Sequence, residues 1–172
     1  MQKVRKAILE DCDIIARIGK ESFLWAHGKS ASKTDIDNYV AKAYNAHEIE
    51  KELRNPLNIY HLIYLEHEVA GFSKLVLNTP NPNIKEPNIA LLDRIYLSSA
   101  FHGKNLGNHL FDFNLTFSKT QNQKGIWLAV WTENHRAINF YQKNGFEIVD
   151  KYDYKISETH SNPNHIMFLP LE

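Results

Sequence analysis

A strand, a helical pattern and a second strand follow one another between residues 89 and 131, and this order most constrains the fold. Residues 89–97 form a near-continuous apolar run, which is typical of a strand buried on both faces. Apolar residues then recur at helical spacing, at Leu106, Leu110, Phe113 and Phe117. A second apolar run covers residues 126–131. Two strands joined by a helix are expected to be parallel neighbours with a right-handed crossover, so the sequence predicts an α/β or α+β protein with a mixed sheet.

Helical patterns dominate the first third of the chain. Asp11 is placed to cap a helix that ends near Gly28. Thr34 and Asp37 resemble a capping box for a second helix, and a third, short helix is expected through Leu53. The apolar stripe of the second helix is expected at Ile36, Tyr39, Val40 and Ala43.

Strand patterns account for most of the remainder. Runs rich in β-branched and aromatic residues predict strands at 4–9, 59–65, 69–77, 146–149 and 165–169. The second and third of these are separated by a short turn and predict an antiparallel hairpin. Asn134 to Asn144 predicts a short helix, with Gly145 at its C′ position. A length of 172 residues fits one domain.

The charge balance limits the partners of this chain. Lys and Arg total 20 and Asp and Glu total 20, so the net charge is zero. A neutral chain does not hold nucleic acid or an anionic membrane by bulk charge, and an anionic ligand has to be bound locally. The single cysteine, Cys12, excludes an intramolecular disulfide and favours a cytoplasmic location. The longest apolar run is too short to span a bilayer, and no signal peptide is visible.

Residues 101–107, Phe-His-Gly-Lys-Asn-Leu-Gly, place two glycines ahead of the helix that begins near Leu106. Unpaired N–H groups and the positive end of a helix dipole make such a turn an anion site. An ordinary strand-to-helix turn explains the same residues. The glycine spacing matches neither G-x-G-x-x-G nor G-x-x-x-x-G-K-[ST], so it does not support a dinucleotide-binding protein or a nucleotide triphosphatase.

This turn resembles the Gln/Arg-x-x-Gly-x-Gly/Ala motif of the GCN5-related N-acetyltransferase (GNAT) family, which holds acetyl-CoA. His102 stands in place of Gln or Arg and Asn105 in place of the first Gly, whereas Gly107 fits. Asparagine tolerates the left-handed backbone region, so the turn is expected to persist. Residues 125–146 are similar to the second family motif, an apolar strand followed by Asn-x-x-Ala-x-x-x-Tyr and Gly-Phe. Within the family, the chain most resembles the PaiA-type spermidine/spermine acetyltransferases, in residues 64–71, 93–97 and 126–131.

The resemblance implies a mixed, mostly antiparallel sheet in which a parallel strand pair splays around the cofactor, with helices on both faces. It implies one N-acetyltransferase domain over residues 1–172, which uses acetyl-CoA and no metal. The expected reaction is direct attack of a small-molecule primary amine, such as a polyamine, on the thioester. A protein or peptide N-acetyltransferase and a non-catalytic acetyl-CoA sensor are the alternatives. A homodimer is a further hypothesis.

The resemblance also implies the site residues. The cofactor pyrophosphate is expected on the turn and the first helical turn, at His102, Gly103, Lys104, Asn105, Leu106, Gly107 and Asn108. The pantetheine arm is expected along the backbone of Ile95, Tyr96 and Leu97, whose N–H groups also suit an oxyanion. Asn134 is expected to contact the same arm. Tyr141 is expected to return a proton to the departing thiolate.

Several of these residues have a plainer interpretation. Lys104 is equally well a solvated lysine, Asn134 a helix N-cap and Tyr141 a core aromatic. Asp93 is the candidate general base if it has no strong partner, and a structural pair with Arg94 is the alternative.

Other polar residues carry weaker signals. Four histidines lack a metal-ligand arrangement and are expected on the surface or in packing: His61, His102, His109 and His135. Acidic side chains on the N-terminal helices either attract a cationic acceptor or form a solvated helix surface: Asp35, Asp37, Glu48, Glu50 and Glu52.

Overall fold

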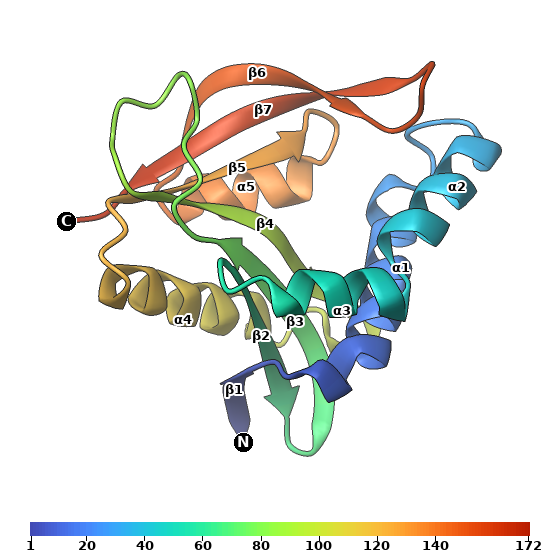
Figure 1. Cartoon of the computed structure of the whole chain (residues 1–172), viewed down its shortest axis with the longest axis horizontal. Helices are drawn as coiled ribbons and strands as arrows, with labels where there is room; N and C mark the ends of the chain where they lie inside the picture. The colour runs from blue at the N-terminus through green and yellow to red at the C-terminus, as the bar shows by residue number, and fades with distance from the viewer.

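Seven strands form one sheet in the order β1-β2-β3-β4-β5-β7-β6 in the computed structural model, which describes residues 1–172 (Figure 1). The strands are β1 (Gln2–Lys6), β2 (Asn58–Leu65), β3 (Glu68–Val76), β4 (Ile89–Leu97), β5 (Gly125–Trp131), β6 (Glu147–Lys155) and β7 (Ser161–Pro170). Every neighbouring pair is antiparallel except β4 and β5, which are parallel. The predicted mixed, mostly antiparallel sheet and its β2–β3 hairpin are confirmed.

Helices cover both faces of this sheet, as predicted (Figure 1). They are α1 (Cys12–His27), α2 (Lys33–Ala43), α3 (Ala46–Arg54), α4 (Leu106–Thr120) and α5 (His135–Lys143), with short 3₁₀ turns η1 (Leu9–Asp11) and η2 (Ser99–Phe101). Ile15 of α1 and Ile49 of α3 pack with Leu62 on one face. Phe111 of α4 and Phe140 of α5 meet on the other face, with ring centroids 6.1 Å apart. None of the helices combines the length and the apolar character needed to cross a membrane.

Two helix caps differ from the prediction. The Asp11 carboxylate does not cap α1, because it accepts hydrogen bonds from the Ile8 N–H at 2.8 Å and from the Arg5 guanidinium at 2.7 Å. The predicted box at Thr34 and Asp37 is wrong by two positions. The Ser32 hydroxyl caps α2 by accepting from the Asp35 N–H at 3.1 Å. Both helices nevertheless lie where their apolar spacing placed them.

The buried stripe of α4 also differs from the predicted one. Phe113 is 38% exposed, whereas the polar Asn114 is fully buried. The Asn114 amide donates to Ser73 Oγ and to the Leu110 carbonyl, both at 2.8 Å, and its Oδ1 lies 2.8 Å from His61 Nδ1. Burial of a polar side chain is tolerated when its hydrogen bonds are met. Asn114 thus connects α4 to β2 and β3.

The parallel strands β4 and β5 pair over only three residues each, from Ile89–Gly125 to Leu91–Trp127. Asp93 is an extra residue in β4, because Lys74 lies opposite Arg94 while the next residue of β3 lies opposite Leu92. A bulge of this kind bends its strand and re-aims the side chains. The prediction that residues 89–97 are buried on both faces is therefore wrong for the second half of β4, whose residues after Leu92 are part-exposed where the strands diverge.

We expect Asn114→Ala to lower the free energy of unfolding by about 2–4 kcal/mol. The variant leaves the buried His61 and Ser73 groups without their partner, and each unsatisfied buried group costs about 1–3 kcal/mol. Urea denaturation measures the difference. Thr116→Ala changes an exposed position of the same helix and is expected to stay within about 0.5 kcal/mol of wild type. Equal stability of the two variants would contradict the proposed connection.

Candidate active site

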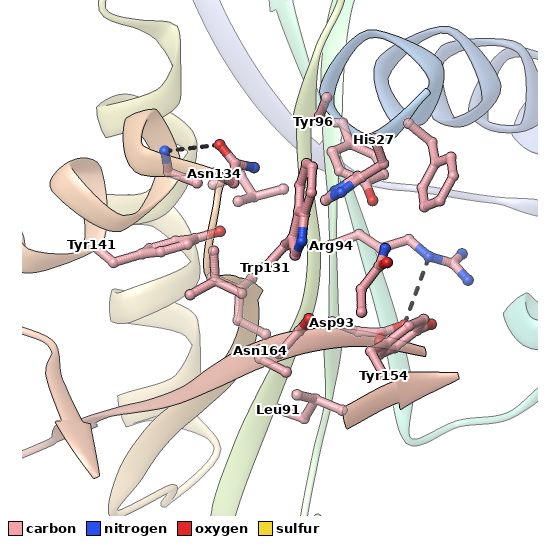
Figure 2. Close-up of a pocket in the computed structure, with 18 of the residues that line it drawn as sticks. His27, Leu91, Asp93, Arg94, Tyr96, Trp131, Asn134, Tyr141, Tyr154 and Asn164 are labelled. Atoms are coloured by element: carbon pink, nitrogen blue, oxygen red, sulfur yellow. Dashed lines mark hydrogen bonds and ion pairs between the residues drawn. The ribbon is translucent and has the colours of Figure 1, made fainter. Parts of the chain in front are cut away.

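A cleft of about 680 Å³ opens where β4 and β5 separate (Figure 2). Its walls come from the end of α1, from α2, β4, β5 and α5, and from the hairpin of β6 and β7. Residues expected to bind the cofactor or to act in catalysis line this cleft: Ile95, Tyr96, Leu97, His102, Gly107, Asn134 and Tyr141. Segments far apart in the sequence therefore meet around one cavity.

The turn before α4 has the backbone conformation that the sequence predicted. Gly103 has φ 78° and Asn105 has φ 59°, so both lie in the left-handed region, which asparagine tolerates best after glycine. The N–H groups of Gly103, Lys104 and Asn105 donate to no backbone carbonyl. The first N–H groups of a helix also lack partners, and together these donors suit an anion. The His102 N–H differs, since it donates to the Ser99 carbonyl at 3.2 Å.

The His102 side chain connects the turn to β4 and α5. Its Nε2 lies 3.2 Å from the Leu97 carbonyl and its Nδ1 lies 3.2 Å from the Arg136 guanidinium. A carbonyl only accepts and a guanidinium only donates, so Nε2 carries the proton and Nδ1 accepts. The Leu97 carbonyl also accepts from Ser22 Oγ at 3.3 Å. His102 therefore stabilises the turn through its ring. The Leu97 carbonyl already accepts hydrogen bonds from within the protein, so it is not free to bind a ligand.

The remaining predicted turn residues lie outside the main cleft. The Leu106 side chain is fully buried in the core, so only its backbone is available to a ligand. The Lys104 ammonium lies 5.4 Å from the centroid of the Phe101 ring, and the Asn108 amide donates to Asn105 Oδ1. Asn108 also lines a polar groove beside α5.

This polar groove adds two cations that the sequence analysis did not identify. Arg136 and Lys143 line it together with Asn108 and Asn139. The three α5 residues follow helical spacing on one polar face, which is the signal that places them together. The groove therefore brings positive charge next to the turn and its unpaired amides.

Tyr141 extends from α5 into the cleft (Figure 2). Its ring packs edge-on against Phe140 at 5.5 Å and Phe146 at 5.6 Å. Burial raises the pKa of the phenol above its usual value, and no hydrogen bond opposes this shift. The hydroxyl therefore keeps its proton at neutral pH. The ring fills the core while the hydroxyl faces the cleft, so packing and chemistry are compatible at this residue.

Asn134 begins α5 at the edge of the same cleft (Figure 2). Its Oδ1 accepts a hydrogen bond from the Ala137 N–H at 3.2 Å, so the N-cap interpretation is confirmed. The cap fixes the start of the helix that carries Tyr141.

Asp93 has strong partners, contrary to the condition for a general base. Lys74 Nζ lies 2.9 Å from carboxylates of both Asp93 and Glu52, and Arg94 lies 3.2 Å from Glu52. Burial raises the pKa of the Asp93 carboxyl, but the charges of Arg94 and Lys74 outweigh it and hold this pKa below its usual value. A carboxylate so stabilised is a weak base. The geometry favours a structural ion cluster. Its member Lys74 was not identified from sequence, and Glu52 was expected only on the acidic helix surface.

The acidic residues of the N-terminal helices mostly form exposed ion pairs along their own helices. Glu48 pairs with Lys51 at 3.4 Å, Glu50 with Arg54 at 2.6 Å, and Asp37 with Lys33. These pairs favour the solvated-surface interpretation, and Glu52 alone turns inward to the ion cluster.

The histidines that were expected on the surface or in packing differ in their burial. His61 is buried beside Asn114, whereas His109 and His135 are exposed. The chain contains no group of three His, Cys, Asp or Glu side chains arranged to hold a metal ion.

The sequence model of the acetyltransferase (GNAT) family matches residues 22–146. The chain belongs to this family. An uncharacterized N-acetyltransferase of Lactobacillus delbrueckii subsp. lactis is 29% identical over 143 residues, covering 83% of each chain. The spermidine N(1)-acetyltransferase of Thermoplasma acidophilum is 25% identical over 155 residues, covering 86% of this chain and 89% of the relative.

Solved structures agree with this assignment at the level of the fold. The crystal structure of the PaiA N-acetyltransferase from Thermoplasma acidophilum, in complex with coenzyme A, has a TM-score of 0.79 at 22% identity and covers 99% of both chains. The predicted family, its PaiA-type resemblance and the acetyltransferase class are confirmed.

Proposed function

We propose that this chain transfers the acetyl group of acetyl-CoA to the primary amine of a small molecule. The observation that carries the proposal is the cleft between the diverging strands β4 and β5, which has the Tyr141 hydroxyl in its wall and ends next to the unpaired backbone amides of the α4 turn. Acetyl-CoA supplies the acetyl group as an activated thioester. The residues of this chain have to bind its phosphates, align its arm and protonate its sulfur.

The donor groups fit a long polyanionic co-substrate. The N–H groups of residues 103–107 suit the pyrophosphate, and Arg136 and Lys143 add positive charge beside them. Beyond Leu91, the edge of β4 faces no strand on the β5 side. The amide-containing pantetheine arm can pair with this edge at Ile95 and Tyr96 as an added strand does.

Tyr141 is the proposed general acid. Its phenol is neutral and opens on the cleft, so it can donate a proton to the departing thiolate. A thiolate of pKa about 8.5 is a good leaving group, and the acid therefore supplies a modest part of the acceleration. A hydroxyl positioned in this way also argues against a sensor that binds acetyl-CoA without turnover.

Spermidine or a similar polyamine is the proposed acceptor. The relative from Thermoplasma acidophilum is named for spermidine. Aromatic side chains line the acceptor side of the cleft and can bind cationic amines through their faces: Tyr39, Trp131, Tyr152 and Tyr154. A peptide amine is the competing acceptor. The single-domain organisation, the homodimer and the cytoplasmic location also stay predictions.

A thiol-release assay with acetyl-CoA and a panel of amines tests this function. The panel contains polyamines, aminoglycosides, amino acids and peptides with free amino groups. We expect spermidine or a related polyamine to give the highest kcat/KM. Release with peptides alone would favour the protein acetyltransferase, and coenzyme A binding without release from any amine would favour the sensor.

We expect Tyr141→Phe to lower kcat by about 10²-fold, at the lower end of the roughly 10²–10⁴-fold range for general acid catalysis. The dissociation constant of coenzyme A is expected to stay the same, because the ring and its packing are retained. Steady-state kinetics and calorimetry measure the two quantities. Tyr64→Phe removes a hydroxyl outside the cleft and serves as the control. An unchanged kcat in Tyr141→Phe would remove Tyr141 from the acid role.

We expect Gly107→Trp to raise the dissociation constant of coenzyme A at least about 100-fold, which is about 2.7 kcal/mol. Gly107 lines the cleft in the first turn of α4, where a large side chain displaces the co-substrate. Gly107→Ala is the control, because its Cβ meets Leu97 and Phe140 at an ordinary 3.7 Å and the fold tolerates it. Normal binding by a folded Gly107→Trp variant would show that the pyrophosphate lies elsewhere.

A further inference from the structure

His27 occupies the last turn of α1 and lines the cleft. Its ring packs against Phe23 at 4.8 Å and against Trp131 at 5.5 Å. Figure 2 shows this ring entering the cleft from α1, whereas Tyr141 enters from α5. His27 therefore lies on the α1 wall of the cleft, apart from the α5 wall that carries Tyr141.

The ring nitrogens of His27 make no hydrogen bond within the protein. The rings of His61, His102 and His160 all have such partners. Only Ser118 Oγ and His165 Nδ1 are polar side-chain atoms that are both fully buried and unpaired, so the His27 nitrogens are open to the cleft. A neutral imidazole offers one N–H donor and one lone-pair acceptor. Both remain available to a ligand.

The surroundings of His27 keep its ring neutral. Burial lowers the pKa of its imidazole to about 4, and no carboxylate opposes this effect. At neutral pH one ring nitrogen therefore presents a free lone pair. The neighbouring faces of Phe23 and Trp131 are electron-rich, and such faces attract N–H groups and cations rather than carboxylates.

We propose that His27 binds the reacting amine of the acceptor: its free ring nitrogen accepts a hydrogen bond from the amine and turns the amine lone pair toward the thioester carbon. This inference rests on the proposed acetyl transfer and names the residue that orients the nucleophile. His27 does not take the proton, because so weak a base does not deprotonate an alkylammonium group. Alignment of a bound nucleophile lowers the barrier by restricting its motion before attack.

Two variants at position 27 test the hydrogen bond. His27→Phe keeps an aromatic ring against Phe23 and Trp131 but removes both nitrogens. We expect it to lower kcat/KM for the amine about tenfold, through both a lower kcat and a higher amine KM, because the amine loses the hydrogen bond that binds and orients it. The KM for acetyl-CoA is expected to stay the same. His27→Gln restores an acceptor atom and is expected to recover part of the loss.

The kinetic outcomes separate an acceptor contact from a structural role. An unchanged amine kcat/KM in His27→Phe would overturn the inference. Equal increases in the amine and acetyl-CoA KM values would do the same, because they indicate a general distortion of the cleft. The amine with the highest kcat/KM in the panel is used throughout.

A binding measurement keeps this test independent of turnover. In protein with ¹⁵N-labelled histidine, the His27 ring signals are assigned by their absence from His27→Phe. With coenzyme A present, we expect these signals to shift when the best amine, or spermidine if none reacts, is added. If no amine supports thiol release, the proposed function is wrong, but the shift of the His27 ring signals still shows whether His27 contacts the amine. No shift, or a shift with glutarate but not with the amine, would overturn the acceptor contact.

Discussion

The short parallel pairing of β4 with β5 is the constraint on which the site depends. The two strands share hydrogen bonds only from Ile89–Gly125 to Leu91–Trp127 and then separate. Backbone groups that lose a strand partner need another partner, such as water or a ligand. The gap gives the cleft its edge of free backbone, and the helix after β5 places Tyr141 within it. Fold and chemistry are therefore linked through one interrupted strand pair.

The bulge at Asp93 and the ion cluster around it explain how β4 diverges from β5. The extra residue turns Asp93 and Arg94 toward the same side of the sheet, where the Asp93 carboxylate pairs with both Lys74 and Arg94. The Lys74 and Arg94 side chains are only 9% and 11% exposed, and buried charges require partners of this kind. Glu52 of α3 completes the balance of two cations and two anions. These charges hold the strand in place, and Asp93 and Arg94 also line the cleft together with the neutral groups of Tyr141 and His27.

A chain with no net charge can still bind a polyanion. The turn before α4 offers N–H groups that are absent from any count of charged residues. Arg136 and Lys143 supply local positive charge on one face of α5, although Lys and Arg do not outnumber Asp and Glu over the whole chain. The same placement separates two binding problems. We propose that the phosphates bind at the turn before α4 and that the acceptor binds in the aromatic part of the cleft.

The sequence by itself determined the features that depend on neighbouring residues. The spacing of apolar residues predicted the positions of the strands and helices. The turn residues Gly103, Asn105 and Gly145 have the left-handed backbone conformation that glycine and asparagine favour. Only the tertiary structure decided which buried polar side chains have hydrogen-bond or ion-pair partners. Asn114 is buried because partners on β2 and β3 reach it, and Asp93 is paired because of Lys74 and Glu52. His27 is distinguished from the other histidines by its open, unpaired ring in the cleft. These properties come from residues distant in the chain, and local patterns carry no record of such contacts.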